Sequence, residues 1–131
     1  MSITIVGLGP SGLANVDTAT RDLLADPASA VILRTGLHPG AKEVLAMRSA
    51  ETCDDLYESL ESFDDVYAAV AARVVEAAAD GTVVYAVPGS PAVGERTVGM
   101  IVALAEDAGI DVGVKPAMSF LDLAYVAVGV D

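Results

Sequence analysis

The sequence predicts an α/β domain with a mainly parallel five-stranded sheet flanked by helices. Segments rich in β-branched residues alternate along the chain with alanine-rich segments of helical period, which is typical of parallel sheets with helical crossovers. The chain is 53% hydrophobic but only 5% aromatic, so its core must consist mainly of small aliphatic side chains. The length of 131 residues suits one domain, which we expect to span residues 1–131.

Five segments carry the strand pattern, at residues 3–6, 30–34, 49–53, 82–87 and 110–114. The segment 82–87 is the most distinct, because it is apolar and ends abruptly in Pro88-Gly89-Ser90-Pro91, directly before a helical pattern. Ligands of open α/β sheets bind where strands end at their carboxyl side, and Gly89 lets backbone come close to a ligand. An ordinary strand-to-helix turn is the alternative interpretation.

Charge and composition exclude several classes of function. The net charge of −12 argues against binding to nucleic acids or anionic membranes. Apolar runs stay short of the roughly 18 residues of a transmembrane helix, and the N-terminus shows no signal-peptide pattern, so we expect a cytoplasmic protein. Cys53 and His38 are the single residues of their kinds, so we expect no disulfide and no metal site.

The first predicted strand leads into Gly7-Leu8-Gly9-Pro10-Ser11-Gly12, which matches the dinucleotide-binding pattern Gly-x-Gly-x-x-Gly. Pro10 removes one backbone amide, and we expect the helix to begin only at Asp17 or Thr18. The acidic residue expected at the end of the second strand is missing, and Arg34 stands there instead. An NADP-binding domain therefore stays open as an alternative, because an arginine suits a 2′-phosphate.

Helices are expected at 41–47, from Ser62 to about Asp80, after the 82–87 loop, and from a Ser119 cap to Val128. In the second of these, Ser62 is the predicted N-cap. Its apolar stripe is interpreted as core packing and comprises Phe63, Tyr67, Val70, Val74 and Ala78. The acidic segment 54–61 is interpreted as solvated surface.

Three loops at the ends of predicted strands are together distinctive. They read Val6-Gly7-Leu8-Gly9-Pro10, Tyr85-Ala86-Val87-Pro88-Gly89-Ser90-Pro91 and Lys115-Pro116-Ala117-Met118-Ser119-Phe120. With them, the chain resembles the N-terminal lobe of the tetrapyrrole (corrin/porphyrin) methylases, which transfer a methyl group from S-adenosylmethionine. Arg34-Thr35 with His38-Pro39, and Glu95-Arg96-Thr97-Val98, are similar to the methylase-like domain fused to MazG-type nucleotide pyrophosphohydrolases.

The resemblance implies where the cofactor binds. It carries over to six positions, Pro10, Gly89, Ser90, Val93, Ser119 and Phe120, which match cofactor-contacting positions of the family. Three departures bear on affinity: Ser90 stands where many members carry an aspartate, Ser11-Gly12 replaces the usual Gly-Asp or Gly-Ser, and Ala117 replaces a common glycine. A complete member has a second lobe, absent from this chain, and holds the cofactor in the cleft between the lobes.

The resemblance further implies a small-molecule methyl acceptor, for which a tetrapyrrole-like compound is one candidate. In-line transfer of a methyl group from a sulfonium needs mainly alignment of donor and acceptor, so we assign no catalytic residue. Arg34, Lys42 and Arg96 are candidates for a basic rim around an anionic acceptor.

We expect the isolated lobe to bind S-adenosylmethionine weakly or not at all, to be inactive alone, and to form a homodimer through exposed apolar surface. A non-enzymatic dimerisation or regulatory module of a MazG-type fusion protein is the alternative function.

Overall fold

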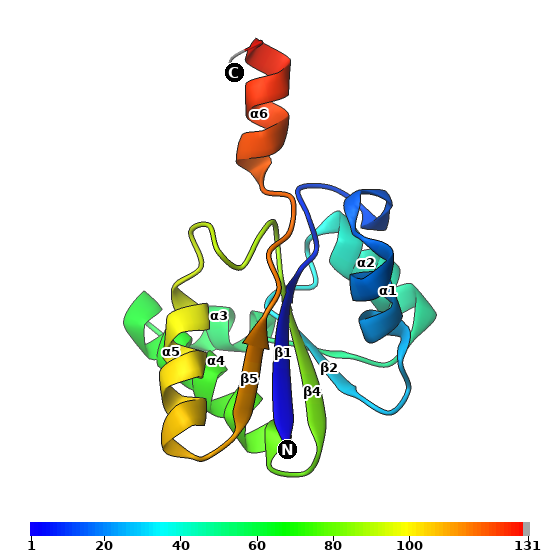
Figure 1. Cartoon of the computed structure of the whole chain (residues 1–131). Coiled ribbons are helices and arrows are strands. Elements are labelled where there is room, and N and C mark those ends of the chain that lie inside the picture. The colour runs from blue at the N-terminus through cyan, green and yellow to red at the C-terminus, as the bar shows by residue number, and fades with distance from the viewer. Residues whose placement is uncertain (130–131) are drawn as a thin grey trace.

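The computed structural model describes residues 1–129 and contains one five-stranded sheet in which every pairing is parallel. The strands are β1 (Ser2–Gly7), β2 (Ala30–Leu33), β3 (Glu51–Thr52), β4 (Thr82–Val87) and β5 (Asp111–Val114). Their order across the sheet is β3-β2-β4-β1-β5. The predicted fold class is therefore confirmed, and β1 and β4 lie next to each other in the middle of the sheet (Figure 1).

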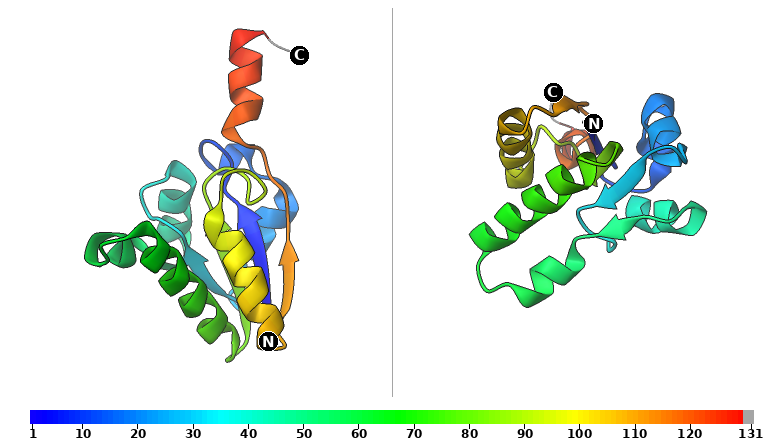
Figure 2. Two further views of the ribbon diagram at one scale, coloured as in Figure 1. Left: turned by 90° about the vertical axis from the view of Figure 1, so that its left-hand side faces the viewer. Right: turned by 90° about the horizontal axis from the view of Figure 1, so that it is seen from below.

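Helices cover both faces of the sheet (Figures 1 and 2). Their bounds are η1 (Leu13–Asn15, a 3₁₀ turn), α1 (Thr18–Ala25), α2 (Pro39–Met47), α3 (Asp54–Ser59), α4 (Phe63–Ala78), α5 (Arg96–Asp107) and α6 (Phe120–Val128). The start of α1 is as predicted, since the carboxylate of Asp17 accepts a hydrogen bond from the Thr20 amide at 2.6 Å. Ser62 likewise caps α4 by accepting from the Asp65 amide.

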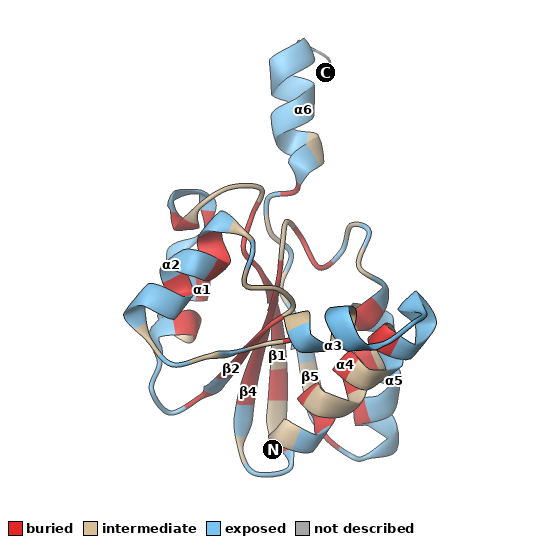
Figure 3. Cartoon of the chain, turned by 180° about the vertical axis from the view of Figure 1, so that it is seen from behind, coloured by how far each residue is buried: buried red, intermediate tan, exposed pale blue. Residues whose placement is uncertain are grey.

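Two apolar clusters, one on each face, form the core. Alternating residues of the strands supply both, so that Ile5 and Tyr85 face α4 and α5 whereas Val6 and Ala86 face α1 and α2. The central strand β4 is buried from Val83 onward, which explains its apolar run. Figure 3 shows this burial along β1, β2 and β4.

The predicted strand at 49–53 is shorter than expected. Only Glu51 and Thr52 pair with β2, at the edge of the sheet. Arg48 instead donates hydrogen bonds to the carbonyls of Leu24, Asp26 and Ser29, so the segment before β3 closes the end of α1 and the turn after it.

The segment 54–61 has no buried residue, as its interpretation as solvated surface predicts, and residues 54–59 form helix α3 on that surface. Asp54 at its start accepts hydrogen bonds from the Thr35 hydroxyl (2.6 Å) and the Gly36 amide (2.8 Å). One interpretation of the next segment was wrong. Phe63 does not join the core stripe. It is 70% exposed and stacks on Tyr67, because the first turn of α4 lies at the margin of the core.

Helix α6 stands away from the rest of the domain (Figures 1 and 2). It has no buried residue, although its sequence is almost entirely apolar. Ser119 caps it as predicted, in a reciprocal arrangement with Asp122. Among the described residues, no helix is long and apolar enough to cross a membrane.

The loops after β1 and β4 meet at two glycine positions. Gly9 and Gly89 form an antiparallel bridge, with Gly89 N–H donating to Gly9 O at 2.8 Å and Gly9 N–H donating to Gly89 O at 3.1 Å. Both glycines have positive φ, 71° and 66°. A Cβ on Gly7 would overlap the Gly89 carbonyl oxygen and the Ala117 side chain, so the loops after β1, β4 and β5 converge here only because residue 7 is glycine.

Replacing Gly7 with alanine should therefore lower the free energy of unfolding by about 2 kcal/mol or more, as overpacking a rigid backbone contact does. Gly99→Ala is the matched control: Gly99 lies inside α5, its added Cβ would meet no atom within 4 Å, and stability should rise by up to about 1 kcal/mol. Urea unfolding of both variants measures the difference. Equal effects would contradict the proposed role of Gly7.

Candidate cofactor cavity

An open cavity with a volume of about 330 Å³ lies at the carboxyl ends of the central strands. The loops after β1, β2, β4 and β5 contribute its lining, which comprises Pro10, His38, Pro88, Gly89, Ser90, Val93, Gly94, Glu95, Ser119 and Phe120. The structure thus brings all six positions carried over from the family into one cavity. Their role in holding a cofactor stays a prediction.

Ser90 ties two of these loops together. Its side chain is buried, and its Oγ accepts hydrogen bonds from the backbone amides of Ala92 and Ala117, each at 3.3 Å. The second bond joins the loop after β4 to the loop after β5. Because both acceptor positions of the hydroxyl are used, only its hydrogen is free to contact a ligand.

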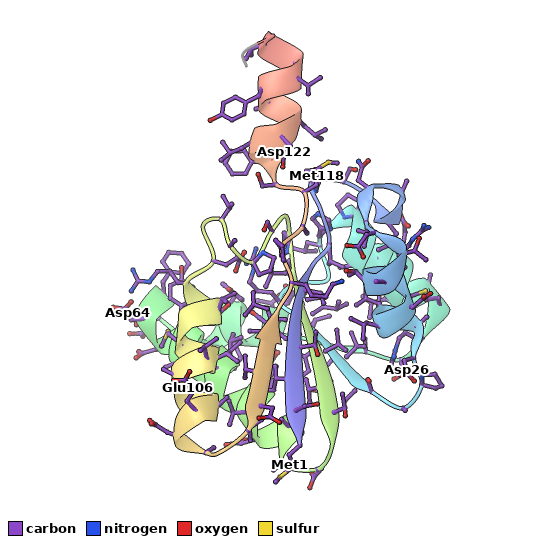
Figure 4. The ribbon with its side chains drawn as sticks, in the orientation of Figure 1. Met1, Asp26, Asp64, Glu106, Met118 and Asp122 are labelled. Carbon is purple, nitrogen blue, oxygen red and sulfur yellow. The ribbon has the colours of Figure 1, made fainter. Side chains whose placement is uncertain are left out.

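Ser119 and Phe120 stand where the third loop turns into α6. Ser119 Oγ accepts from the Leu121 amide at 3.2 Å, and its own amide donates to Asp122 Oδ2 at 2.8 Å. The hydroxyl therefore serves the helix cap. Phe120 is 62% exposed and forms an open apolar wall of the cavity. Figure 4 marks Asp122 at the base of the projecting helix.

His38 lines the cavity, although it is not among the six positions carried over from the family. It is the N-cap of α2, and its Nδ1 accepts the Gly40 amide at 3.0 Å. Burial lowers the pKa of His38. The nearby Gly9 carbonyl raises this pKa, and the charge of Arg34 lowers it further. The neutral ring therefore carries its hydrogen on Nε2, which is buried and has no hydrogen-bond partner within residues 1–129.

Glu95 is the second lining residue that the sequence analysis missed. Its carboxylate lies 3.1 Å from Arg34 Nε, and the two side chains are only 11% and 24% exposed. Burial raises the pKa of Glu95, although Arg34 acts in the opposite direction. Arg34 also donates to the Tyr57 hydroxyl at 3.4 Å and lies over the Tyr57 ring. The only sequence signal was the similarity around Glu95-Arg96.

The expected basic rim does not form. Arg34 is engaged with Glu95 and Tyr57. Lys42 is exposed on α2 outside the lining, and Arg96 points to Asp64 at 3.8 Å. Acidic partners from other elements direct the two arginine side chains. The position of a loop in the sequence does not show where such a side chain points.

The first loop does not present its amides to a ligand phosphate. Glu43 of α2 accepts the Leu13 amide at 3.2 Å, and a Cβ on Gly12 would overlap the same carboxylate. The Glu43 carboxylate thus binds a backbone amide of the kind that binds the pyrophosphate in a dinucleotide-binding fold. Together with the engaged Arg34, this arrangement argues against the NADP-binding alternative.

The lining is poorly suited to a nucleotide phosphate. Within the described part of the chain, no Lys or Arg lines the cavity, so it offers no cation for a phosphate. Its walls are mainly apolar side chains and loop backbone, together with His38 and Glu95, and its volume lies near the lower end of small-molecule sites. Gly89 leaves open space where a side chain would stand.

No metal or thiol chemistry is suggested by the described residues. Among residues 1–129, no three His, Cys, Asp or Glu side chains gather as metal ligands. Cys53 is fully buried, and burial raises its pKa to about 11, so its thiol is inert.

The fold and the position of the cavity define a class of protein. A family model described as tetrapyrrole (corrin/porphyrin) methylases matches residues 2–131, so the chain belongs to this family. The sequence-based family prediction is confirmed at this level.

Particular relatives share different amounts of their length with it. The YabN protein of Bacillus subtilis (strain 168) is 35% identical over 130 residues, which make up 98% of this chain and 26% of YabN. A uroporphyrin-III-C-methyltransferase from Thermus thermophilus superposes with a TM-score of 0.71 at 25% identity, covering 99% of this chain and 53% of that one.

A structure of uroporphyrin-III C-methyltransferase from the same organism, complexed with S-adenyl homocysteine, gives a TM-score of 0.63 at 21% identity, over 92% and 50% of the two chains. A diphthine synthase superposes with a TM-score of 0.73 at 18% identity, covering 100% of this chain and 50% of that one. The chain thus spans about a quarter of YabN and about half of these solved structures.

The burial of His38 predicts a pH effect on stability. Because its folded-state pKa lies below its unfolded value, protonation favours the unfolded chain, and the free energy of unfolding should decrease as the pH falls through about 6.5. His38→Asn keeps an N-cap acceptor but does not titrate, so the stability difference between the two proteins should change in this range. NMR titration of the ring, with a midpoint at or above the ordinary value, would contradict this.

Proposed function

We propose that this chain forms one wall of the cofactor cleft of an S-adenosylmethionine-dependent methyltransferase, with the six carried-over residues and the loop backbone around them holding the cofactor. The observation that carries this proposal is the convergence of the loops after β1, β4 and β5 on one cavity. Family membership and the complex of a related fold with S-adenyl homocysteine support it.

Each part of the lining has a defined task in this proposal. The Gly9–Gly89 bridge fixes the floor, and Ser90 holds the loop after β5 against it. Val93 and Phe120 offer apolar surface, and the neutral His38 ring forms part of the wall. S-adenosylmethionine, when bound, supplies an electrophilic methyl group, and the chain's contribution is to align it with an acceptor.

The remaining parts of the proposal follow the family. We propose that a second lobe completes the cleft, that the isolated chain is inactive, and that the acceptor is a small molecule, with tetrapyrrole-like compounds the first to test. The cavity is open on the side of Phe120, and a single wall encloses too little of a ligand for tight binding. A cytoplasmic location is part of the same proposal.

NMR titration of the ¹⁵N-labelled chain with S-adenosylmethionine should show weak binding at millimolar ligand, with shifts confined to the cavity and centred on Gly89, Val93 and Phe120. NADPH should cause no shifts there, because no basic side chain lines the described cavity. Submicromolar binding would contradict the idea of an incomplete cleft. Shifts scattered elsewhere, or none at all, would contradict the cofactor site.

A second candidate function rests on α6. A helix that is apolar all round is normally buried, yet the side chain of Val126 is 80% exposed and neighbouring apolar residues are also open to solvent. We propose that the chain associates as a homodimer through this helix. In the alternative function, the chain is a non-enzymatic module of a MazG-type fusion protein, and its only role is to hold two copies of that protein together.

Sedimentation of the chain at micromolar concentrations should then show a dimer. Val126→Ser should raise the dimer dissociation constant about tenfold, because it removes apolar area from the interface. Met47→Ser is the control, since Met47 is an exposed apolar residue at the end of α2. A monomeric wild-type chain would overturn the proposal, as would equal effects of the two substitutions.

A further inference from the structure

Glu95 is the single formally charged side chain among the ten lining residues of the cofactor cavity. The cations nearest to it in the fold do not share this surface. Arg34 lies behind Glu95 and lines a separate cavity of about 230 Å³ with Thr35, Leu37, Asp54 and Tyr57. The ion pair is therefore the partition between the two cavities, with its negative end toward the candidate cofactor.

The other groups around Glu95 do not cancel this charge. His38 is neutral near pH 7, because burial lowers its pKa and its Nδ1 is used in the cap of α2. Lys115 is near Asp17 at 3.9 Å, and Arg96 faces Asp64. A chain with a net charge of −12 adds a negative background. Among these groups, only Arg34 offsets the negative charge of Glu95, and its charge also acts on His38.

We propose that Glu95 is a specificity-determining residue that makes the cavity select ligands with a positive charge, and so favours S-adenosylmethionine, with its sulfonium, over the neutral thioether S-adenosylhomocysteine. This inference rests on the proposed function. Its physical basis is Coulomb attraction to a carboxylate whose side chain is only 11% exposed, where a charge acts more strongly than on the open surface. Arg34 keeps the carboxylate in place and weakens its field, so the effect is moderate.

The selectivity has a consequence for turnover. Transfer of the methyl group leaves the cofactor without its positive charge, while the charge of Glu95 is unchanged. The cavity thus holds the form that can donate a methyl group more tightly than the form that has lost it. Such a preference would limit inhibition by the product.

The test compares three ligands by NMR titration of the chain: S-adenosylmethionine, S-adenosylhomocysteine and sinefungin, in which an amine-bearing carbon replaces the sulfonium. Both cationic ligands should bind the wild-type chain about three- to tenfold more tightly than S-adenosylhomocysteine. Glu95→Gln should reduce this ratio to near one, mainly by weakening the cationic ligands. Glu95→Asp should keep the preference, since it retains the charge.

Two further variants make the result unambiguous. Glu106→Gln changes the net charge equally at an exposed position of α5 and should leave the ratio as in the wild type. The double variant R34M/E95M replaces the buried pair with apolar chains, which folded proteins often tolerate, and should also abolish the preference if Glu95→Gln alone unfolds the chain.

The outcomes separate the two proposals. If all three ligands bind equally to wild type and Glu95→Gln, the role of Glu95 is overturned while the cofactor site stands. If none of the three shifts the cavity resonances at millimolar concentration, the proposed function fails and the selectivity fails with it.

Discussion

The close approach of the first and fourth strands' loops is the constraint on which the candidate site depends. Parallel pairing of β1 with β4 brings Gly7 beside Val87, and the chain then continues into the reciprocal Gly9–Gly89 bridge. No side chain fits between the Gly7 backbone and the Gly89 carbonyl. Once this contact is made, the loop after β5 is fixed as well, because Lys115 N–H donates to Ile5 O and Ser90 accepts from Ala117. The cavity is thus a product of backbone packing more than of projecting side chains.

This origin explains the chemistry of the lining. Serines that a sequence suggests as ligand contacts are used here to hold loops and to cap a helix. The polar groups left in the lining are loop backbone, the hydroxyl hydrogen of Ser90, the neutral His38 ring and the carboxylate of Glu95. The first loop matches the sequence pattern of a dinucleotide-binding motif. Its Leu13 amide donates to the Glu43 carboxylate, so it is not available to bind a ligand anion.

The sequence was a good guide to elements with a strong local cause. Strand β4 follows from its apolar run, and the caps at Asp17, Ser62 and Ser119 follow from hydroxyl or carboxylate side chains before helical patterns. The short edge strand β3 was overestimated, because its pairing depends on how Arg48 binds the end of α1. That contact joins segments distant in sequence and leaves no local pattern.

Site residues divide in the same way. The six carried-over positions were named from the family resemblance, and they share one cavity because their loops follow three neighbouring parallel strands. His38 and Glu95 come into the lining through a cap and a long-range ion pair, and the sequence similarity around His38-Pro39 and Glu95-Arg96 did not assign either of them a role. The expected basic rim failed for a related reason, since each arginine is directed by an acidic or aromatic partner from another element.

Phe120 belongs at once to the cavity and to α6, the helix that stands away from the rest of the domain and has no buried residue. Whatever surface comes to cover α6 therefore also sets one wall of the cavity. Covering the helix and filling the cavity are then thermodynamically linked events, and each should strengthen the other by the same factor. A nine-residue helix without buried side chains would in this way act as the coupling between assembly and ligand affinity.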